Sequence, residues 1–170
     1  MKKQWWMLST IIILAIIAIL QSTSVGSEEL PKTGYQAPHF SLQALDGQTY
    51  SLKSLNRKPV VINFWASWCG PCKIEAPELV RLYDKYKDRV EIYAVNVTAS
   101  DSIEAAKAFA QDYGFQFPVL IDEKGEVAQK YAIRPIPTTL FVNSEGVIAE
   151  QVIGLVDPQT MEMKFRQLLP

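Results

Sequence analysis

The sequence predicts an α/β domain with a central mixed sheet, flanked by helices. Continuous apolar runs, typical of strands buried on both faces, alternate with segments whose apolar residues recur at helical spacing. A final pair of strand-like segments is joined by a short turn, so a hairpin closes the sheet. With 170 residues and a formal net charge of −1, the chain is long enough for one hydrophobic core and lacks the basic face of a nucleic-acid-binding protein.

The N-terminal residues predict a membrane anchor ahead of this domain. Residues 1–4 are a basic end, and residues 5–20 are an apolar run. As a helix this run would be about 24 Å long, slightly short of a hydrocarbon core of about 30 Å. Residues 21–36 are polar and are expected to be a linker, and residues 37–170 are expected to form the domain.

The alternative for the apolar run is a cleaved signal peptide. Ser24, Val25 and Gly26 are small residues of the kind that a signal peptidase accepts. In both cases the lysines before the run place the rest of the chain on the extracytoplasmic side. The expected location is therefore a single-pass membrane protein, with a secreted protein as the alternative.

The domain is expected to begin with a hairpin, a buried strand and a helix. Residues 37–52 alternate apolar and polar positions around Asp46-Gly47, a pair that suits the positive φ of a tight turn. Residues 59–66 are a continuous apolar run rich in β-branched residues, which predicts a strand buried on both faces. A helix is expected next, because apolar residues recur at helical spacing: Leu79, Leu82, Tyr83 and Tyr86.

A second strand and helix follow. Residues 90–97 predict another buried strand. Residues 100–114 predict a helix, with Asp101 and Glu104 as its N-terminal cap and Gly114 as its stop.

The remaining segments complete the sheet and add a final helix. Residues 117–122 predict a strand and residues 125–133 a short helix, and residues 138–154 predict a hairpin turned by 143–146. Asp157 and Pro158 are expected to open the last helix. Its buried face would carry three apolar residues: Met161, Phe165 and Leu168.

The two cysteines of the chain lie three positions apart at the start of a predicted helix. At a helix N-terminus, unpaired N–H groups and the helix dipole would lower the pKa of Cys69 from about 8.5 toward about 7. Cys72 would lie one turn in on the same face, so the two sulfurs can meet. Cys69 is therefore expected to attack disulfides and the deeper Cys72 to resolve them. Between them, Gly70 permits close approach of a substrate backbone and Pro71 has no N–H to leave unpaired.

Other uses of the pair are less favoured. A zinc site would need four ligands, and only His39 and carboxylates could complete it. A purely structural disulfide that closes so short a loop would gain little loop entropy. We therefore expect no bound metal and no cofactor.

The residues around the cysteines resemble the thioredoxin superfamily. Residues 68–73, Trp-Cys-Gly-Pro-Cys-Lys, match its active-site signature, and Ile136-Pro137-Thr138 is similar to its cis-proline loop. The N-terminal hairpin, an inserted strand and helix around residues 95–109, and the apolar N-terminus are similar to the membrane-anchored TlpA/ResA-type branch. The resemblance implies a thioredoxin-like fold with these two additions, in which the proline loop lies against the cysteine pair.

The resemblance also implies site residues beyond the cysteines. A substrate-docking surface is expected to include five residues: Trp68, Gly70, Pro71, Ile136 and Pro137.

Asn63 and Gly70 differ from the residues found at these positions in other members of the superfamily. Asn63 stands where cytoplasmic thioredoxins carry a buried aspartate that handles the proton of the deeper thiol. Glu75, one helical turn beyond Cys72, matches a glutamate near the thiols of ResA-type proteins. If it is desolvated, its pKa rises and it can exchange protons with Cys72, whereas the alternative is a solvated helix glutamate. Gly70 replaces an acidic residue of many ResA-type proteins, which favours the Cys69 thiolate.

The function implied by the resemblance is a thiol-disulfide oxidoreductase that reduces disulfides in exported proteins, for example apocytochrome c or spore-envelope proteins. Electrons would come from a membrane thiol donor, and the chain is expected to be a monomer without a nucleic-acid partner. One alternative is a copper-carrying protein, which would need His39 as a ligand although it lies at the wrong end of the domain. Another is a peroxiredoxin-like peroxidase, suggested by the similarity of residues 37–52 to peroxiredoxin N-termini.

Overall fold

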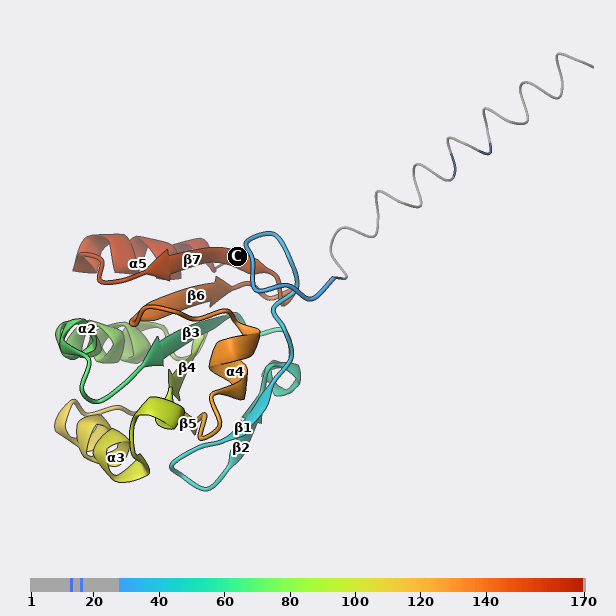
Figure 1. The fold of residues 1–170 in the computed structure, drawn as a ribbon. Helices are drawn as coiled ribbons and strands as arrows, with labels where there is room; N and C mark the ends of the chain where they lie inside the picture. Colours follow the sequence, from blue (N-terminus) through green and yellow to red (C-terminus); the bar gives the residue numbers. More distant parts are fainter. Residues whose placement is uncertain (1–12, 14–15, 17–27, 170) are drawn as a thin grey trace, which may run out of the picture.

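A mixed five-stranded sheet forms the centre of the fold, which the computed structural model describes for residues 13, 16 and 28–169. The strand order is β5-β4-β3-β6-β7. β3 pairs in parallel with β4 and antiparallel with β6, which confirms the predicted mixed sheet (Figure 1). The bounds of the strands are β3 (Val60–Trp65), β4 (Glu91–Asn96), β5 (Val119–Ile121), β6 (Thr138–Val142) and β7 (Ile148–Ile153).

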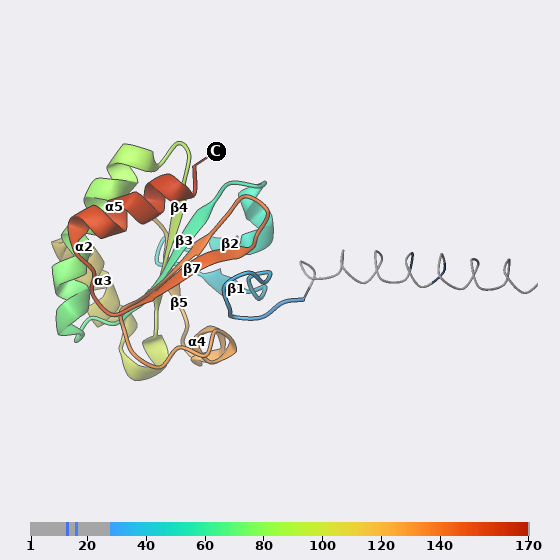
Figure 2. The same ribbon diagram turned by 90° about the horizontal axis from the view of Figure 1, so that it is seen from above.

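Helices cover both faces of this sheet, as Figure 2 shows. On one face lie the three long helices, α2 (Gly70–Tyr86), α3 (Ile103–Asp112) and α5 (Pro158–Gln167). On the other face lie α4 (Glu126–Lys130) and the hairpin of β1 (Ser41–Gln43) and β2 (Thr49–Ser51). Each face buries its own hydrophobic cluster.

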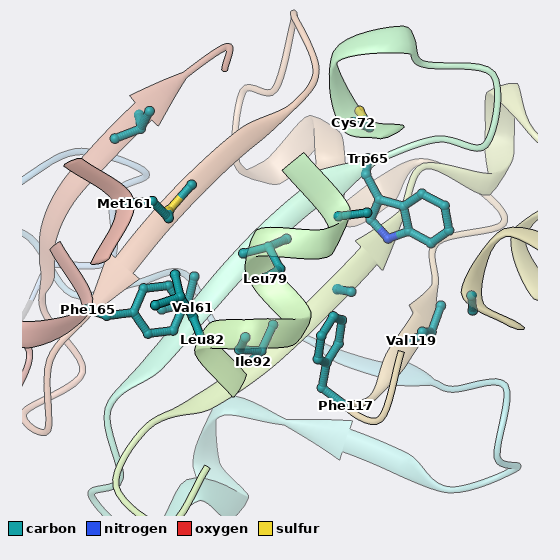
Figure 3. Close-up of a cluster of buried hydrophobic side chains, with 14 of the residues drawn as sticks. Val61, Trp65, Cys72, Leu79, Leu82, Ile92, Phe117, Val119, Met161 and Phe165 are labelled. Atoms are coloured by element: carbon teal, nitrogen blue, oxygen red, sulfur yellow. The ribbon is translucent and has the colours of Figure 1, made fainter. Parts of the chain in front are cut away.

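The central strand β3 is buried along its whole length. Its six residues all have less than one tenth of their surface exposed, because helices cover the sheet on both sides. Figure 3 shows the cluster on the α2 side, where Leu79 and Leu82 of α2 and Phe165 of α5 lie over Val61. The apolar periodicity predicted for α2 and α5 is thus confirmed. After β3 the chain continues to the start of α2, whose cysteines belong to this cluster.

The N-terminal hairpin forms as predicted. Gly47 has a φ of 79°, and Asp46 Oδ1 accepts a hydrogen bond from the backbone N–H of Gln48 at 2.9 Å. The backbone N–H of Leu45 donates to the carbonyl of Val119 at 2.9 Å, which fastens the hairpin to the edge strand β5.

The N-terminal cap predicted for α3 is wrong at Asp101. The side chain of Ser102 accepts the hydrogen bond from the backbone N–H of Ala105, at 3.1 Å. Asp101 ends the 3₁₀ turn η2 (Thr98–Ser100), and its carboxylate instead binds residues outside α3. Gly114, with a φ of 70°, follows the last turn of the helix as predicted.

The predicted anchor over residues 5–20 and the basic end 1–4 lie outside the described residues, apart from Ile13 and Ile16. In the part of the chain that the structure describes, no helix has the length and apolarity needed to cross a bilayer. Residues 28–36, at the end of the predicted linker, are bound to the domain. The backbone of Ile148 in β7 donates to Tyr35 and accepts from Gly34, each at 2.9 Å, because an edge strand has unpaired backbone groups.

The packing of α5 can be tested at Phe165, which is fully buried, stacks on Tyr86 and meets Phe141 edge-on. Phe165→Ala should lower the free energy of unfolding by about 3–5 kcal/mol, because it removes buried surface and leaves a cavity. Denaturant unfolding of the full chain, followed by circular dichroism, measures this loss. Met163→Ala, at a half-exposed position of the same helix, should change it by less than about 1 kcal/mol. Equal effects of the two substitutions would contradict the assigned core.

Candidate active site

Cys69 and Cys72 form a disulfide at the N-terminus of α2, with an S–S distance of 2.02 Å and a Cα–Cα distance of 5.2 Å. Cys69 is the N-cap residue, in extended backbone geometry, and Pro71 lies in the first turn. The backbone N–H of Cys72 points at the sulfur of Cys69, at 3.2 Å. After reduction this N–H and the helix dipole would stabilise negative charge on Cys69, which is the property that thiol–disulfide exchange requires.

The two cysteines are buried to the same extent, each with 3% of its surface exposed. The exposed fractions therefore do not support the expectation that Cys72 lies deeper than Cys69. Position along the backbone distinguishes them instead, since Cys69 precedes the helix and faces its first free N–H groups while Cys72 lies within the first turn. A Cβ added at Gly70 would meet no atom within 4 Å, so the surface beside Cys69 is open.

Glu75 lies on the inner face of α2 and is buried, with 3% of its surface exposed. Its Oε2 accepts a hydrogen bond from Asn63 Nδ2 at 2.8 Å, while its Oε1 has no hydrogen-bond partner among the described residues. Burial raises the pKa of Glu75 to about 7, although the hydrogen bond from Asn63 opposes this rise. The solvated alternative is therefore wrong, and Glu75 can take up or release a proton near neutral pH.

Asn63 has a structural role that the sequence did not reveal. Its side-chain amide donates to both Glu75 and Thr139, at 2.8 and 2.9 Å, and so joins β3, α2 and β6. A polar residue in the middle of an apolar strand was the available signal, because a buried amide needs partners.

The predicted proline loop is also confirmed in its backbone geometry. The Ile136–Pro137 peptide bond is cis, and the loop leads directly into β6. The carbonyl of Pro137 accepts a hydrogen bond from Gly154 at 2.8 Å. Ile136 packs against both hydrophobic clusters, one of which contains the two cysteines. Thr138, which follows the loop, pairs with Phe64 near the end of β3, so the loop and the cysteines lie at the same end of the sheet.

Apolar side chains are exposed around the start of α2. Trp68 and Ile74 have 59% and 67% of their surfaces exposed, and Leu155 has 44%. A pocket of about 330 Å³ lies between α2 and the loop before α5, lined by Ile74, Glu75, Leu155 and Met161 among others. Neither cysteine lines this pocket, and neither lines the hollows of about 600 and 690 Å³ beside the hairpin. We place the candidate site at the disulfide because reactive groups and exposed apolar surface coincide there.

The structure does not bring His39 to the cysteines. His39 is exposed and lies 3.7 Å from Glu29, next to Phe40, which belongs to the cluster on the opposite face of the sheet from the disulfide. Within residues 13, 16 and 28–169, no three His, Cys, Asp or Glu side chains are grouped closely enough to hold a metal ion.

The model of the AhpC/TSA family matches residues 33–151. The chain is 36% identical over 170 residues to the thioredoxin-like protein YneN of Bacillus subtilis, covering 97% of this chain and 98% of that protein. It is 34% identical over 175 aligned positions to the thiol-disulfide oxidoreductase ResA of Bacillus anthracis, with complete coverage of both chains. The crystal structure of StoA from Bacillus subtilis has a TM-score of 0.67 and 28% identity, and covers 75% of this chain and 96% of StoA.

Burial of Glu75 has a measurable effect on stability. Its pKa rises from the ordinary 4.5 to about 7 on folding, so the folded chain holds a proton that the unfolded chain releases between these pH values. The stability contributed by this proton is present below pH 4.5 and is lost as the pH rises to 7, by up to about 3 kcal/mol. Denaturant unfolding of the oxidised chain between pH 4 and 8 should show this loss relative to Glu75→Gln.

The control for this measurement is Glu126→Gln, at an exposed position in the first turn of α4. It should leave the pH profile parallel to that of the unmodified chain. If Glu75→Gln also gives a parallel profile, Glu75 is not protonated on folding.

Proposed function

We propose that this chain, which belongs to the AhpC/TSA family and is a thiol-disulfide oxidoreductase, reduces disulfide bonds of exported proteins through Cys69 and Cys72. The observation that carries the proposal is the disulfide at the start of α2, with the Cys72 N–H at 3.2 Å from the Cys69 sulfur. The clients are proteins with disulfide bonds, in keeping with the names of the thiol-disulfide oxidoreductases to which the chain is similar.

The reaction proceeds by two exchanges. The Cys69 thiolate attacks one sulfur of a client disulfide, forms a mixed disulfide and releases the other client sulfur as a thiolate that takes up a proton. Cys72 then loses its proton and attacks Cys69, which releases the second client sulfur and forms the Cys69–Cys72 disulfide. Two electrons pass to the client, and two protons balance the charge.

Glu75 serves as the proton acceptor for Cys72 in this scheme. It lies one helical turn beyond Cys72, and its pKa of about 7 lets it accept and release protons under neutral conditions. Asn63 holds the carboxylate through Oε2 and leaves Oε1 free to take the proton, since Oε1 lacks a partner within the described part of the chain.

Clients dock on the exposed surface around the disulfide. Trp68 supplies the large apolar contact, and the open side of Gly70 and Pro71 lets a client backbone approach Cys69. Ile136 and Pro137 form the other wall, since their loop leads into β6, whose first residue, Thr138, pairs with β3 near the end from which the chain continues to Cys69.

The proposed place of action is the extracytoplasmic side of the membrane. The basic end at residues 1–4 and the apolar run over 5–20 support a single-pass anchor. Electrons would arrive from a membrane thiol donor, and apocytochrome c is one candidate client, which would assign the chain to cytochrome c biogenesis. Secretion after signal cleavage is the alternative, and alkaline extraction of membranes separates the two, because a spanning helix resists it.

The alternatives of a copper carrier and a peroxidase receive less support. His39 contacts Glu29 on the far side of the sheet, so the three-ligand set that copper binding would need is not gathered. Cys69 has its partner three residues away, as exchange requires, and the relatives described above carry names of thioredoxin-like and thiol-disulfide proteins.

Trapping should identify the clients. In Cys72→Ala the mixed disulfide cannot be resolved, so client proteins should remain bound to Cys69 when the full chain is expressed in its own membrane. Non-reducing electrophoresis and mass spectrometry would detect them. The matched variant Cys69→Ala should trap few or none, and equal trapping by both variants would reverse or remove the roles assigned to the two cysteines.

The direction of electron flow follows from the reduction potential. We expect a potential near that of thioredoxin, about −270 mV, because the residues between the cysteines are Gly and Pro, as in the reducing members of the superfamily that the sequence resembles. Equilibrium titration of the full chain against glutathione measures it. A value near −120 mV, typical of a strong oxidant, would contradict the proposed reductase.

A further inference from the structure

The loop that precedes Cys69 is bound to a segment from another part of the chain. Ser67 donates twice to the carboxylate of Asp101, from its backbone N–H and from its hydroxyl, each at 2.6 Å. The indole N–H of the neighbouring Trp68 donates to the carbonyl of Ser100 at 2.7 Å. Three hydrogen bonds therefore fix the two residues immediately before Cys69 to the turn between β4 and α3.

The carboxylate of Asp101 is held in place by its other contacts. It also accepts from Asn96 Nδ2 and from the backbone N–H of Ser102, each at 2.9 Å. Asn96 is fully buried, and the hydroxyl of Thr98 donates to its side-chain oxygen at 2.8 Å, which directs its NH₂ group toward Asp101. All four donors thus converge on one carboxylate, whose position is set by β4 and η2.

These contacts suit the ionised form of Asp101. Burial alone would raise its pKa, but the hydrogen bonds from Asn96, Ser67 and Ser102 outweigh burial and hold the pKa below the ordinary value. An ionised carboxylate only accepts hydrogen bonds, and every group that faces it here is a donor.

Capping of α3 does not explain this arrangement. The side chain of Ser102 binds the free N–H of Ala105 and so caps the helix. Asp101 instead accepts two of its four hydrogen bonds from Ser67, 34 positions away in the sequence.

We propose that Asp101 is a positioning residue for disulfide exchange, which fixes Ser67 and thereby presents the Trp68 indole to client proteins beside Cys69. Trp68 keeps 59% of its surface exposed although its N–H is bound, so its ring is ordered and available. Ordering the ring in advance lowers the entropy lost when a protein client binds. A small disulfide that reaches Cys69 without touching Trp68 gains nothing from this order. The role rests on the proposed function.

The test compares a protein disulfide with a small one. The reduced full-length chain is mixed with insulin or with hydroxyethyl disulfide, and the second-order rate constant is measured in a single turnover. Asp101→Asn should lower the insulin rate constant about tenfold, because an amide would turn an N–H toward donors and lose charge-assisted hydrogen bonds. The rate constant with hydroxyethyl disulfide should change less than about twofold.

Two further variants distinguish positioning from stability. Ser102→Ala removes the cap of the same helix but leaves the contacts of Ser67 and Trp68, so both rate constants should stay at the level of the unmodified chain. Trp68→Phe removes the bond to Ser100, and in its background Asp101→Asn should cause little further loss with insulin. If Asp101→Asn does not fold, Ser67→Ala, which deletes only the hydroxyl contact, should give a smaller loss confined to insulin.

Equal losses with both disulfides, no loss with insulin, or the same selective loss in Ser102→Ala would overturn the positioning role while leaving the proposed function intact. An unmodified chain that reduces neither disulfide would overturn the proposed function and, with it, this role.

Discussion

The constraint on which the structure depends is the complete burial of β3. A parallel neighbour on one side and an antiparallel one on the other leave β3 no free edge, and helices and the hairpin cover its two faces. The chain emerges from the buried core at the end of β3 and continues into α2, with Cys69 as the N-cap residue. The reactive pair thus follows a fully buried central strand and lies where the helix has unpaired N–H groups.

A second consequence of this burial is the raised pKa of Glu75. The inner face of α2 packs on β3, so a carboxyl on that face has little access to water. Removing a charged carboxylate from water costs free energy. Asn63, in the middle of β3, offsets only part of that cost because it donates a hydrogen bond to a single oxygen of the carboxylate. The proton affinity of Glu75 is therefore a product of helix packing, not of a neighbouring charge.

Local patterns predicted the elements well, and contacts between distant segments were harder to predict. The apolar run of β3, the periodicity of α2 and the hairpin at Gly47 were readable because they depend on near neighbours. Asp101 was mistaken for a helix cap because its true partner, Ser67, lies 34 positions away. The bond from Asn63 to Glu75 and the binding of residues 28–36 to β7 likewise depend on tertiary pairing.

Residues 28–36 are attached to the domain at the end of the sheet opposite the cysteines. Their hydrogen bonds to Glu145 and Ile148 lie at the β6–β7 turn, beside the beginning of β3, whereas the cysteines follow the end of that strand. Six residues of strand separate the two points, roughly 20 Å. The chain therefore enters the domain at the end opposite the disulfide, so the described residues ahead of Ala37 do not cover the approach of a large folded protein to Cys69.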